Sequence, residues 1–337
     1  MEQPARRAAT LASAMPPGIG EPDARTWAVS DARAGNLRQA QALADALDPA
    51  HADSCILQPQ WPWRMFAPRW MPGSRHAFGD GFTALARAAP AVAVGCGRQA
   101  ALATRLLRVQ GARAVQILDP RITSTHWDLV IVPRHDRLRG TNVLTTLGSL
   151  HPVDAAWLAR ARETFAAFAA LPRPRTAVLL GGSSRHVRFD RMAFELLAGK
   201  LETALARDGG SLLLTASRRS SRELRMALRH RYRETPGLTW LGPEDGDNPY
   251  AGMLAWADRI VCSPDSVNMI SEACATDVPV HVFDPARAHG RLKSFLDSLL
   301  TCGRIRAVDA QLAPFDVEPL RETTRVADEV RERLDLH

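Results

Sequence analysis

The stretch 259–283 constrains the fold of this chain more than any other part. Two short apolar runs, 259–262 and 278–283, are separated by small polar residues and a segment with helical spacing. A strand, a helix and a second strand in this order pair in parallel, because the helix carries the chain back to the edge where the first strand began. The same alternation recurs along the chain, which predicts a doubly wound α/β protein.

The 337 residues are enough for two domains. The alternation begins near Thr26, is interrupted by the proline-rich stretch 171–175 and then resumes. We predict a disordered tail over 1–25 and an N-terminal Rossmann-like domain over 26–150. A connecting helix and linker over 151–175, a C-terminal Rossmann-like domain over 176–310 and a C-terminal helix over 311–337 follow. We expect the two domains to face each other across a central cleft.

The composition favours a globular protein with polyanionic partners. Apolar residues make up 46% of the chain, and the formal net charge is +7. The alternative explanation of the charge is that an Arg-rich composition reflects genome base composition. Nucleic acid is not an expected partner, because the basic clusters lack aromatic interleaving and zinc-ligand spacing.

Neither a membrane span nor a disulfide framework is expected. No apolar run approaches eighteen residues, and the five cysteines are scattered without a CxxC pair. We therefore expect a cytoplasmic protein, with the inner face of the cytoplasmic membrane as an open alternative.

The segment 59–79 is unlike the rest of the chain. It interleaves four prolines with arginines and with the aromatic residues Trp61, Trp63, Phe66, Trp70 and Phe78. Aromatic and arginine side chains together suit a membrane interface, a lip that binds an acceptor, or a partner surface. The alternative is an irregular loop whose aromatic rings fold back onto the core.

Small polar residues at the ends of apolar runs are the candidate ligand contacts. Ser263, Asp265 and Ser266 precede a helix, where unpaired N–H groups and the helix dipole attract an anion. Glu272, about two turns later, suits neutral hydroxyl groups such as those of ribose. This pattern favours a sugar nucleotide, and the lack of a GxGxxG motif makes NAD or FAD less expected.

Two further strand ends carry candidate phosphate contacts. Gly182, Ser183 and Ser184 follow the run 176–180 and could cradle a diphosphate, although an ordinary strand-to-helix turn has the same composition. Arg218 and Arg219 could neutralise a leaving diphosphate, and the alternative is a solvated basic turn.

A transfer that inverts the anomeric configuration of the sugar needs a base that takes the proton from the acceptor hydroxyl. Asp31, in the turn after the first strand, and His135, at another strand end, are the two candidates. Asp31 could instead be a helix cap. No metal-ligand cluster is visible in the sequence.

The ordered set of motifs resembles the mitochondrial fission Elm family, which is widespread in bacteria. The matching pieces are Ser30–Asn36, Gly95–Arg98, Gln116–Arg121, Pro133–Asp136, Leu180–Ser183, Thr215–Arg219, Asn248–Tyr250 and Asp265–Ala273. The second half is also similar to bacterial GT-B glycosyltransferases that act on lipid-linked acceptors. That resemblance implies that Asn248 and Tyr250 border a nucleobase, whereas Asn248 could simply cap a helix.

We therefore expect a GT-B-like, metal-independent glycosyltransferase. It would move a sugar from a nucleoside diphosphate sugar to a cell-envelope lipid or glycan. We expect no separate cofactor. The expected partners are an anionic membrane surface or a lipid-linked acceptor. A non-catalytic scaffold and a sugar-nucleotide epimerase remain alternatives. The expected substrate contacts are Gly35, Asn36, Gly182, Ser183, Ser184, Arg218, Arg219, Asn248, Tyr250, Asp265, Ser266, Met269 and Glu272.

Overall fold

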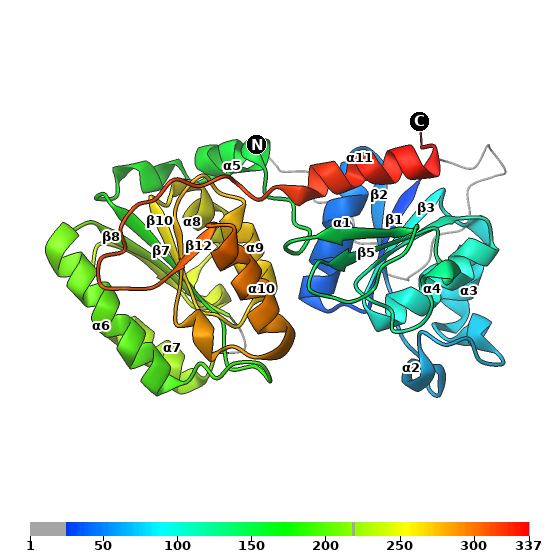
Figure 1. Cartoon of the computed structure of the whole chain (residues 1–337), viewed down its shortest axis with the longest axis horizontal. Helices are drawn as coiled ribbons and strands as arrows, with labels where there is room; N and C mark the ends of the chain where they lie inside the picture. The colour runs from blue at the N-terminus through cyan, green and yellow to red at the C-terminus, as the bar shows by residue number, and fades with distance from the viewer. Residues whose placement is uncertain (1–24, 218–219, 337) are drawn as a thin grey trace. The chain divides into compact units, whose positions relative to one another are not determined.

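The computed structural model describes residues 25–217 and 220–336, which form two compact units (Figure 1). Unit 1 holds residues 25–152 and 322–336, and unit 2 holds the described part of 153–321. The tail predicted over 1–25 lies almost wholly outside the described residues, as do Arg218 and Arg219.

Unit 1 is built on a six-stranded sheet in which all neighbouring strands are parallel. The strands lie in the order β2-β1-β3-β4-β5-β6. They are β1 (Thr26–Ser30), β2 (Ala52–Ile56), β3 (Val92–Cys96), β4 (Arg113–Ile117), β5 (Leu129–Pro133) and β6 (Val143–Thr146). The helices are α1 (Ala34–Leu47), α2 (Trp63–Phe66), α3 (Gly79–Leu85), α4 (Arg98–Val109) and α11 (Glu322–Leu334).

Unit 2 is also built on a six-stranded parallel sheet, but with a different strand order, β12-β11-β10-β7-β8-β9. Its strands are β7 (Arg175–Leu180), β8 (Ser211–Ala216), β9 (Gly237–Trp240), β10 (Arg259–Cys262), β11 (Val280–Val282) and β12 (Ile305–Ala307). Its helices are α5 (Ala155–Thr164), α6 (Arg191–Asp208), α7 (Arg222–Arg231), α8 (Tyr250–Trp256), α9 (Val267–Cys274) and α10 (Gly290–Thr301). Both sheets confirm the predicted doubly wound α/β class.

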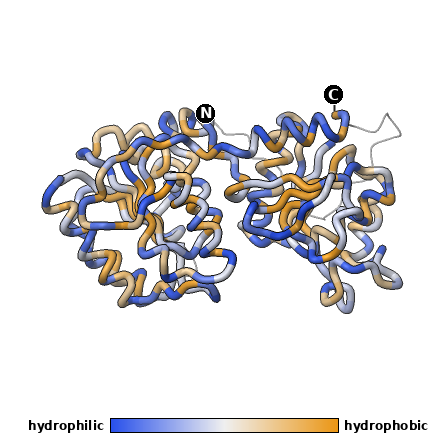
Figure 2. The backbone as a smooth tube through the Cα atoms, in the orientation of Figure 1, coloured by the Kyte–Doolittle hydropathy of each residue, from blue (hydrophilic) through white to orange (hydrophobic). Residues whose placement is uncertain are grey.

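Both faces of each sheet are covered, as the apolar runs require. In unit 1, Ala28 and Val94 pack in a cluster with α1 and α11, whereas Trp27 and Val29 pack in a cluster with α3 and α4. The alternation follows from the two-residue period of a strand. Figure 2 shows the same layering, with the most hydrophobic colour concentrated on the strands of both units.

The C-terminal helix is part of unit 1. Helix α11 follows the last strand of unit 2 in sequence, yet it buries Val326, Val330 and Leu334 in the cluster that includes Leu43 of α1. Its Glu322 accepts hydrogen bonds from the backbone of Leu147 and Gly148 at 2.7 and 2.9 Å. The apolar stripe of this charged helix therefore completes the core of unit 1.

The segment 151–175, predicted as a connection between the two domains, lies almost entirely in unit 2. Its helix is α5, capped by Asp154, and a 3₁₀ stretch, Ala166–Ala170, follows it. Both belong to unit 2, where α5 packs against α8 and Arg162 donates to the carbonyl of Ala255 at 2.9 Å. The chain thus enters unit 2 about twenty residues before its first strand.

Candidate functional site

The candidate site of unit 2 lies at the point where the strand order reverses. From β7 the chain proceeds outward through β8 and β9, and it then returns to the other side of β7 with β10. The loops after β7 and β10 therefore begin side by side and diverge, which is where ligands of such sheets bind. These loops contain Gly181–Ser184 and Ser263–Ser266, two of the predicted motifs.

A buried hydrogen-bond network joins these two loops. The Gly181 N–H donates to Ser263 Oγ at 2.7 Å, and Ser263 Oγ donates to Asp265 Oδ1 at 2.6 Å. The other carboxylate oxygen of Asp265, Oδ2, accepts from the Gly182 N–H at 2.9 Å. Asp265 is only 7% exposed, so its carboxylate shapes the loop from inside.

Packing against Asp265 also explains why position 181 is a glycine. A Cβ atom on Gly181 would lie 2.0 Å from Oδ2 of Asp265, so no larger residue fits while the carboxylate stays in place. The Gly181 carbonyl accepts a hydrogen bond from buried Ser220. The network therefore fixes the loop after β7 from three directions.

Helix α9 is held at both ends. Ser266 is its N-cap and accepts from the Met269 N–H at 3.4 Å, while residues 266–269 are half-buried. At the other end the buried guanidinium of Arg304 donates to the carbonyls of Cys274 and Thr276 at 2.9 and 2.8 Å. A cation at this end satisfies the last carbonyl groups and opposes the helix dipole.

Glu272 and Tyr250 come together in the structure. The phenol of Tyr250, at the start of α8, donates to Oε2 of Glu272 at 2.6 Å. Glu272 is 4% exposed, whereas Tyr250 is half-buried. Two residues that the sequence assigned to ribose and to the nucleobase therefore form a single polar pair on neighbouring helices.

The remaining predicted contacts in unit 2 shape surface turns. Ser183 Oγ accepts from the Phe189 N–H at 3.1 Å, and Ser184 Oγ accepts from the His186 N–H at 3.2 Å. The Tyr250 N–H donates to Oδ1 of Asn248 at 3.0 Å, which closes a turn just before α8, whose N-cap position is Pro249.

The equivalent point in unit 1 lies between β1 and β3. Here Asn36 Nδ2 donates to Oδ1 of Asp31 at 3.4 Å, and Gly35 offers its carbonyl to Gln39 at 3.3 Å. Gly97, just after β3, has a φ of +92°, and a Cβ on it would lie 2.4 Å from Asn36 Nδ2. The predicted residues Asp31, Gly35 and Asn36 therefore gather at one strand end.

His135 stands apart from Asp31. It follows β5, which is three strands from β1 and thus about 14 Å away at the spacing of a sheet. Burial lowers the pKa of His135, although the neighbouring Asp136 acts in the opposite direction. Burial raises the pKa of Asp136. The structure therefore offers two separate candidate bases and no single acid–base pair made of them.

Three contributors were missed by sequence reasoning. Ser220 closes the loop after β7, Arg304 holds α9, and Gly97 packs on Asn36. Gly97 lies in the matched motif Gly95–Arg98, and that was its available signal. Arg304 gives no local signal, because it lies about thirty residues from the carbonyls that it binds.

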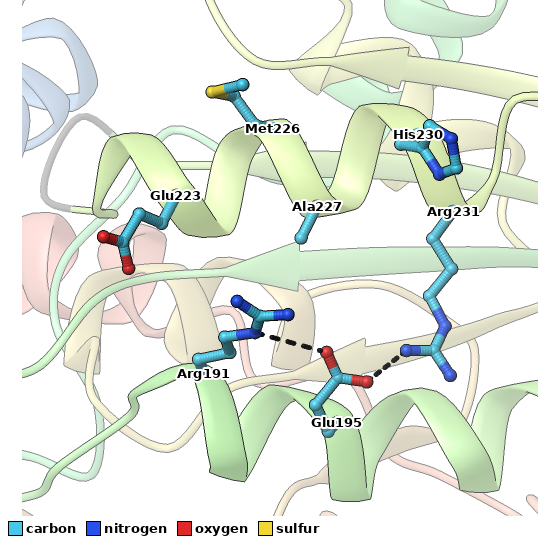
Figure 3. A pocket seen from close by; sticks show the side chains of 7 residues that line it. All are labelled: Arg191, Glu195, Glu223, Met226, Ala227, His230 and Arg231. Atoms are coloured by element: carbon cyan, nitrogen blue, oxygen red, sulfur yellow. Dashed lines mark hydrogen bonds and ion pairs between the residues drawn. The ribbon is translucent and has the colours of Figure 1, made fainter.

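An open groove of about 570 Å³ lies elsewhere on unit 2, between α6 and α7 (Figure 3). Arg231 bridges it by pairing with Glu195 and with Glu202, the latter at 2.5 Å. Pairing with Arg231 lowers the pKa of Glu202. The groove shares no lining residue with the predicted site.

The described residues contain neither a candidate metal site nor a candidate membrane span. Within 25–217 and 220–336, no three His, Cys, Asp or Glu side chains are grouped so that they could hold a metal ion. In the same ranges no helix combines the length and the apolar character needed to span a bilayer.

Comparison with known proteins identifies the family. A family model described as "Mitochondrial fission ELM1" matches residues 34–334. The mitochondrial fission protein ELM1 of Arabidopsis thaliana is 30% identical over 276 residues, which are 73% of this chain and 64% of the plant protein. The chain thus matches less than two thirds of that relative's length. The uncharacterized protein RP120 of Rickettsia prowazekii (strain Madrid E) is 22% identical, with 92% of this chain and 99% of that protein covered. The chain belongs to the mitochondrial fission ELM1 family.

Solved structures of other proteins share the fold. The UDP-GlcNAc 2-epimerase of Neisseria meningitidis, bound to UDP-GlcNAc, matches with a TM-score of 0.55 and 10% identity over 93% of this chain and all of that chain. Os79 of O. sativa, in complex with UDP, matches with a TM-score of 0.51 and 13% identity over 92% and 91% of the two chains. These likenesses establish a GT-B type of fold, as the sequence predicted.

Proposed function

We propose that this member of the family binds a nucleoside diphosphate sugar at the strand ends of unit 2 and transfers the sugar to a cell-envelope lipid or glycan. The observation that carries the proposal is the Tyr250–Glu272 pair, joined at 2.6 Å, with Glu272 in the helix that begins at the switch point of the sheet. The nucleotides named for the similar solved structures support this choice of ligand.

The start of α9 would hold the diphosphate. Its first N–H groups have no partner within the helix, and the dipole favours an anion there. Because Asp265 already accepts from Gly182 and Ser263, we assign it to shaping this loop. The phosphate contacts are then the backbone after Ser266, the hydroxyls of Ser183 and Ser184, and Arg218 or Arg219.

Glu272 would bind the ribose. It lies six residues beyond Ser266, which is about 9 Å along a helix axis. A carboxylate accepts hydrogen bonds from hydroxyl groups, and its bond from Tyr250 fixes its orientation. Tyr250 would lie at the edge of the nucleobase, with Asn248 and Met269 nearby in sequence. The donor is a substrate in this proposal, and no separate cofactor takes part.

Unit 1 would supply the acceptor and the base. Asp31 has a side chain only 13% exposed and lies beside Asn36 at a strand end. His135 is the second candidate, since a lowered pKa keeps its imidazole neutral and able to accept a proton. Asp31→Asn and His135→Gln separate the two: the variant of the true base loses transfer and keeps donor affinity.

Thermal shift with uridine, guanosine, cytidine, adenosine and thymidine diphosphate sugars tests the proposal. We expect one base to stabilise the protein, and Tyr250→Phe to reduce that shift by removing one donor while keeping the ring. If no sugar nucleotide binds, a recruitment scaffold with the same fold becomes the better account. Conversion of the free sugar nucleotide without an acceptor would indicate an epimerase.

A further inference from the structure

The segment between β2 and α3 presents an apolar surface to solvent. Trp61, Met65, Phe66 and Trp70 are 73%, 61%, 45% and 47% exposed, and we call these four side chains the apolar tip. They lie on and around α2, which stands out from the body of unit 1 in Figure 1. Large apolar side chains gathered in this way mark an interaction surface.

The apolar tip rests on an ordered base. Trp63 donates to the Pro72 carbonyl at 2.9 Å, while Ala67, Pro68 and Phe78 are buried. From α4, Gln99 donates to the Arg64 carbonyl at 2.8 Å, and Arg105 donates to the Pro68 carbonyl at 2.5 Å. The segment is thus held against α4 by its backbone and by the Trp70 ring, 5.7 Å from the guanidinium of Arg105, while the four large side chains stay substantially exposed.

The charged side chains of the segment 54–79, which contains the apolar tip, have one sign. No Asp or Glu occurs from residue 54 to residue 79, a stretch that contains Arg64, Arg69 and Arg75, all exposed. Figure 3 offers a contrast: the α6–α7 groove is also lined by an exposed apolar side chain, Met226, but its arginines are accompanied by Glu195 and Glu223. An anionic surface is therefore attracted to the apolar tip and not to that groove.

We propose that the apolar tip docks unit 1 on a bilayer rich in anionic phospholipid. Tryptophan and arginine suit the level of the headgroups, because each combines an apolar body with a polar end. Met65 and Phe66 would enter the acyl boundary, and the arginines would meet the lipid phosphates. This inference does not depend on the donor site, which lies in unit 2.

Vesicle flotation of the full chain tests the proposal, with vesicles of phosphatidylcholine alone or with about a third of phosphatidylglycerol. We expect wild-type protein to bind the anionic vesicles and to be released by high salt. The double variant Trp61→Ser, Met65→Ser should bind at least about tenfold more weakly, because two exposed side chains no longer bury apolar area. Arg64→Glu, Arg69→Glu should lose a similar factor on anionic vesicles.

Matched controls lie on unit 2. Met192→Ser, Leu196→Ser changes side chains that are 74% and 53% exposed, and Arg188→Glu, Arg233→Glu gives the same change of net charge. We expect both controls to bind as wild type does. Failure of wild-type protein to bind anionic vesicles, or equal loss in the controls, overturns the proposal. The proposal would also be contradicted if the tip variants bound the vesicles as wild type does but no longer bound a protein partner. An unchanged thermal unfolding temperature shows that each variant is folded, and an unchanged thermal shift with sugar nucleotide shows that the donor site is separate.

Discussion

Unit 1 and unit 2 are both doubly wound parallel sheets, but they differ in strand order and in how the loops at their switch points are held. In unit 2, Asp265 and Ser263 link the loops after β7 and β10 through buried hydrogen bonds of 2.6 to 2.9 Å. In unit 1, the corresponding contact joins Asp31 to Asn36 at 3.4 Å, and the neighbouring residues 32–34 are exposed. The doubly wound parallel class that the two units share therefore does not by itself determine how tightly a strand-end loop is held.

The difference suggests a division of labour. A closed, buried network gives unit 2 a fixed loop and a helix held at both ends, which suits a ligand of constant structure such as a nucleoside diphosphate. The more open strand end of unit 1, together with its apolar tip, suits an acceptor of variable structure.

The two aspartates should differ most in their contribution to stability. Asp265→Ala leaves the Gly182 N–H and Ser263 hydroxyl without their acceptor, so we expect the free energy of unfolding to fall by about 4 kcal/mol. Asp31→Ala removes a long hydrogen bond from Asn36 and an ion pair with exposed Arg33 at 3.5 Å, and should cost less than about 1 kcal/mol. Urea denaturation of both variants measures this, with exposed Asp277→Ala as the control. Equal losses of unfolding free energy in Asp265→Ala and Asp31→Ala would show that the two strand-end loops are held equally tightly.

Acid should destabilise unit 2 through His281. Burial lowers the pKa of His281, in β11, to about 4, with Arg259 and Arg306 acting in the same direction and Asp309 against it. The unfolded chain takes up this proton near pH 6.5, so folded-state stability present at neutral pH is lost as pH falls from about 6.5 to 4. The loss amounts to about 3 kcal/mol.

His281→Leu isolates that contribution. The variant should lose less stability than wild type over the same pH range, as measured by amide hydrogen exchange in unit 2. His135 in unit 1 also has a lowered pKa, so exchange must be followed separately in each unit. The same pH dependence in the variant and in wild type would show that His281 is not responsible.

Packing at the unit 1 strand end can be measured with two glycines. Gly97 and Gly111 both have left-handed φ values, +92° and +102°, but only a Cβ on Gly97 would meet Asn36. We expect Gly111→Ala to cost about 1 kcal/mol from backbone strain and Gly97→Ala about 2 kcal/mol. Thermal unfolding of the two variants gives the difference. Equal costs would mean that Asn36 moves freely and that this strand end is looser than described.

Much of the fold could be predicted because the central strands are continuous apolar runs. The apolar runs 259–262 and 278–283 contain β10 and β11, the two strands of the predicted strand–helix–strand segment. Helix α9, between them, begins after Ser266 as expected. The edge strands β6 and β12 were not predicted. They have only four and three residues, and one of them is largely exposed, so they carry little apolar pattern.

The site was predictable as a set of strand ends and not as a network. Sequence position identified Glu272, Tyr250 and Asp265, but the Tyr250–Glu272 bond joins two different helices. The close approach of Gly181 to Asp265 depends on the pairing of β7 with β10, which no local pattern reveals. Likewise, the amphipathic pattern of α11 predicted a helix but not the unit against which it packs.

The central claim is that Glu272 in unit 2 binds a sugar nucleotide, and isothermal titration calorimetry tests it most directly. The nucleotide sugar selected by thermal shift is titrated into wild type, Glu272→Gln and the exposed control Glu223→Gln. We predict binding by wild type and by the control, and an affinity at least about tenfold weaker for Glu272→Gln, since a charged acceptor is lost. Undiminished affinity in Glu272→Gln, or no binding to wild type, would contradict the account.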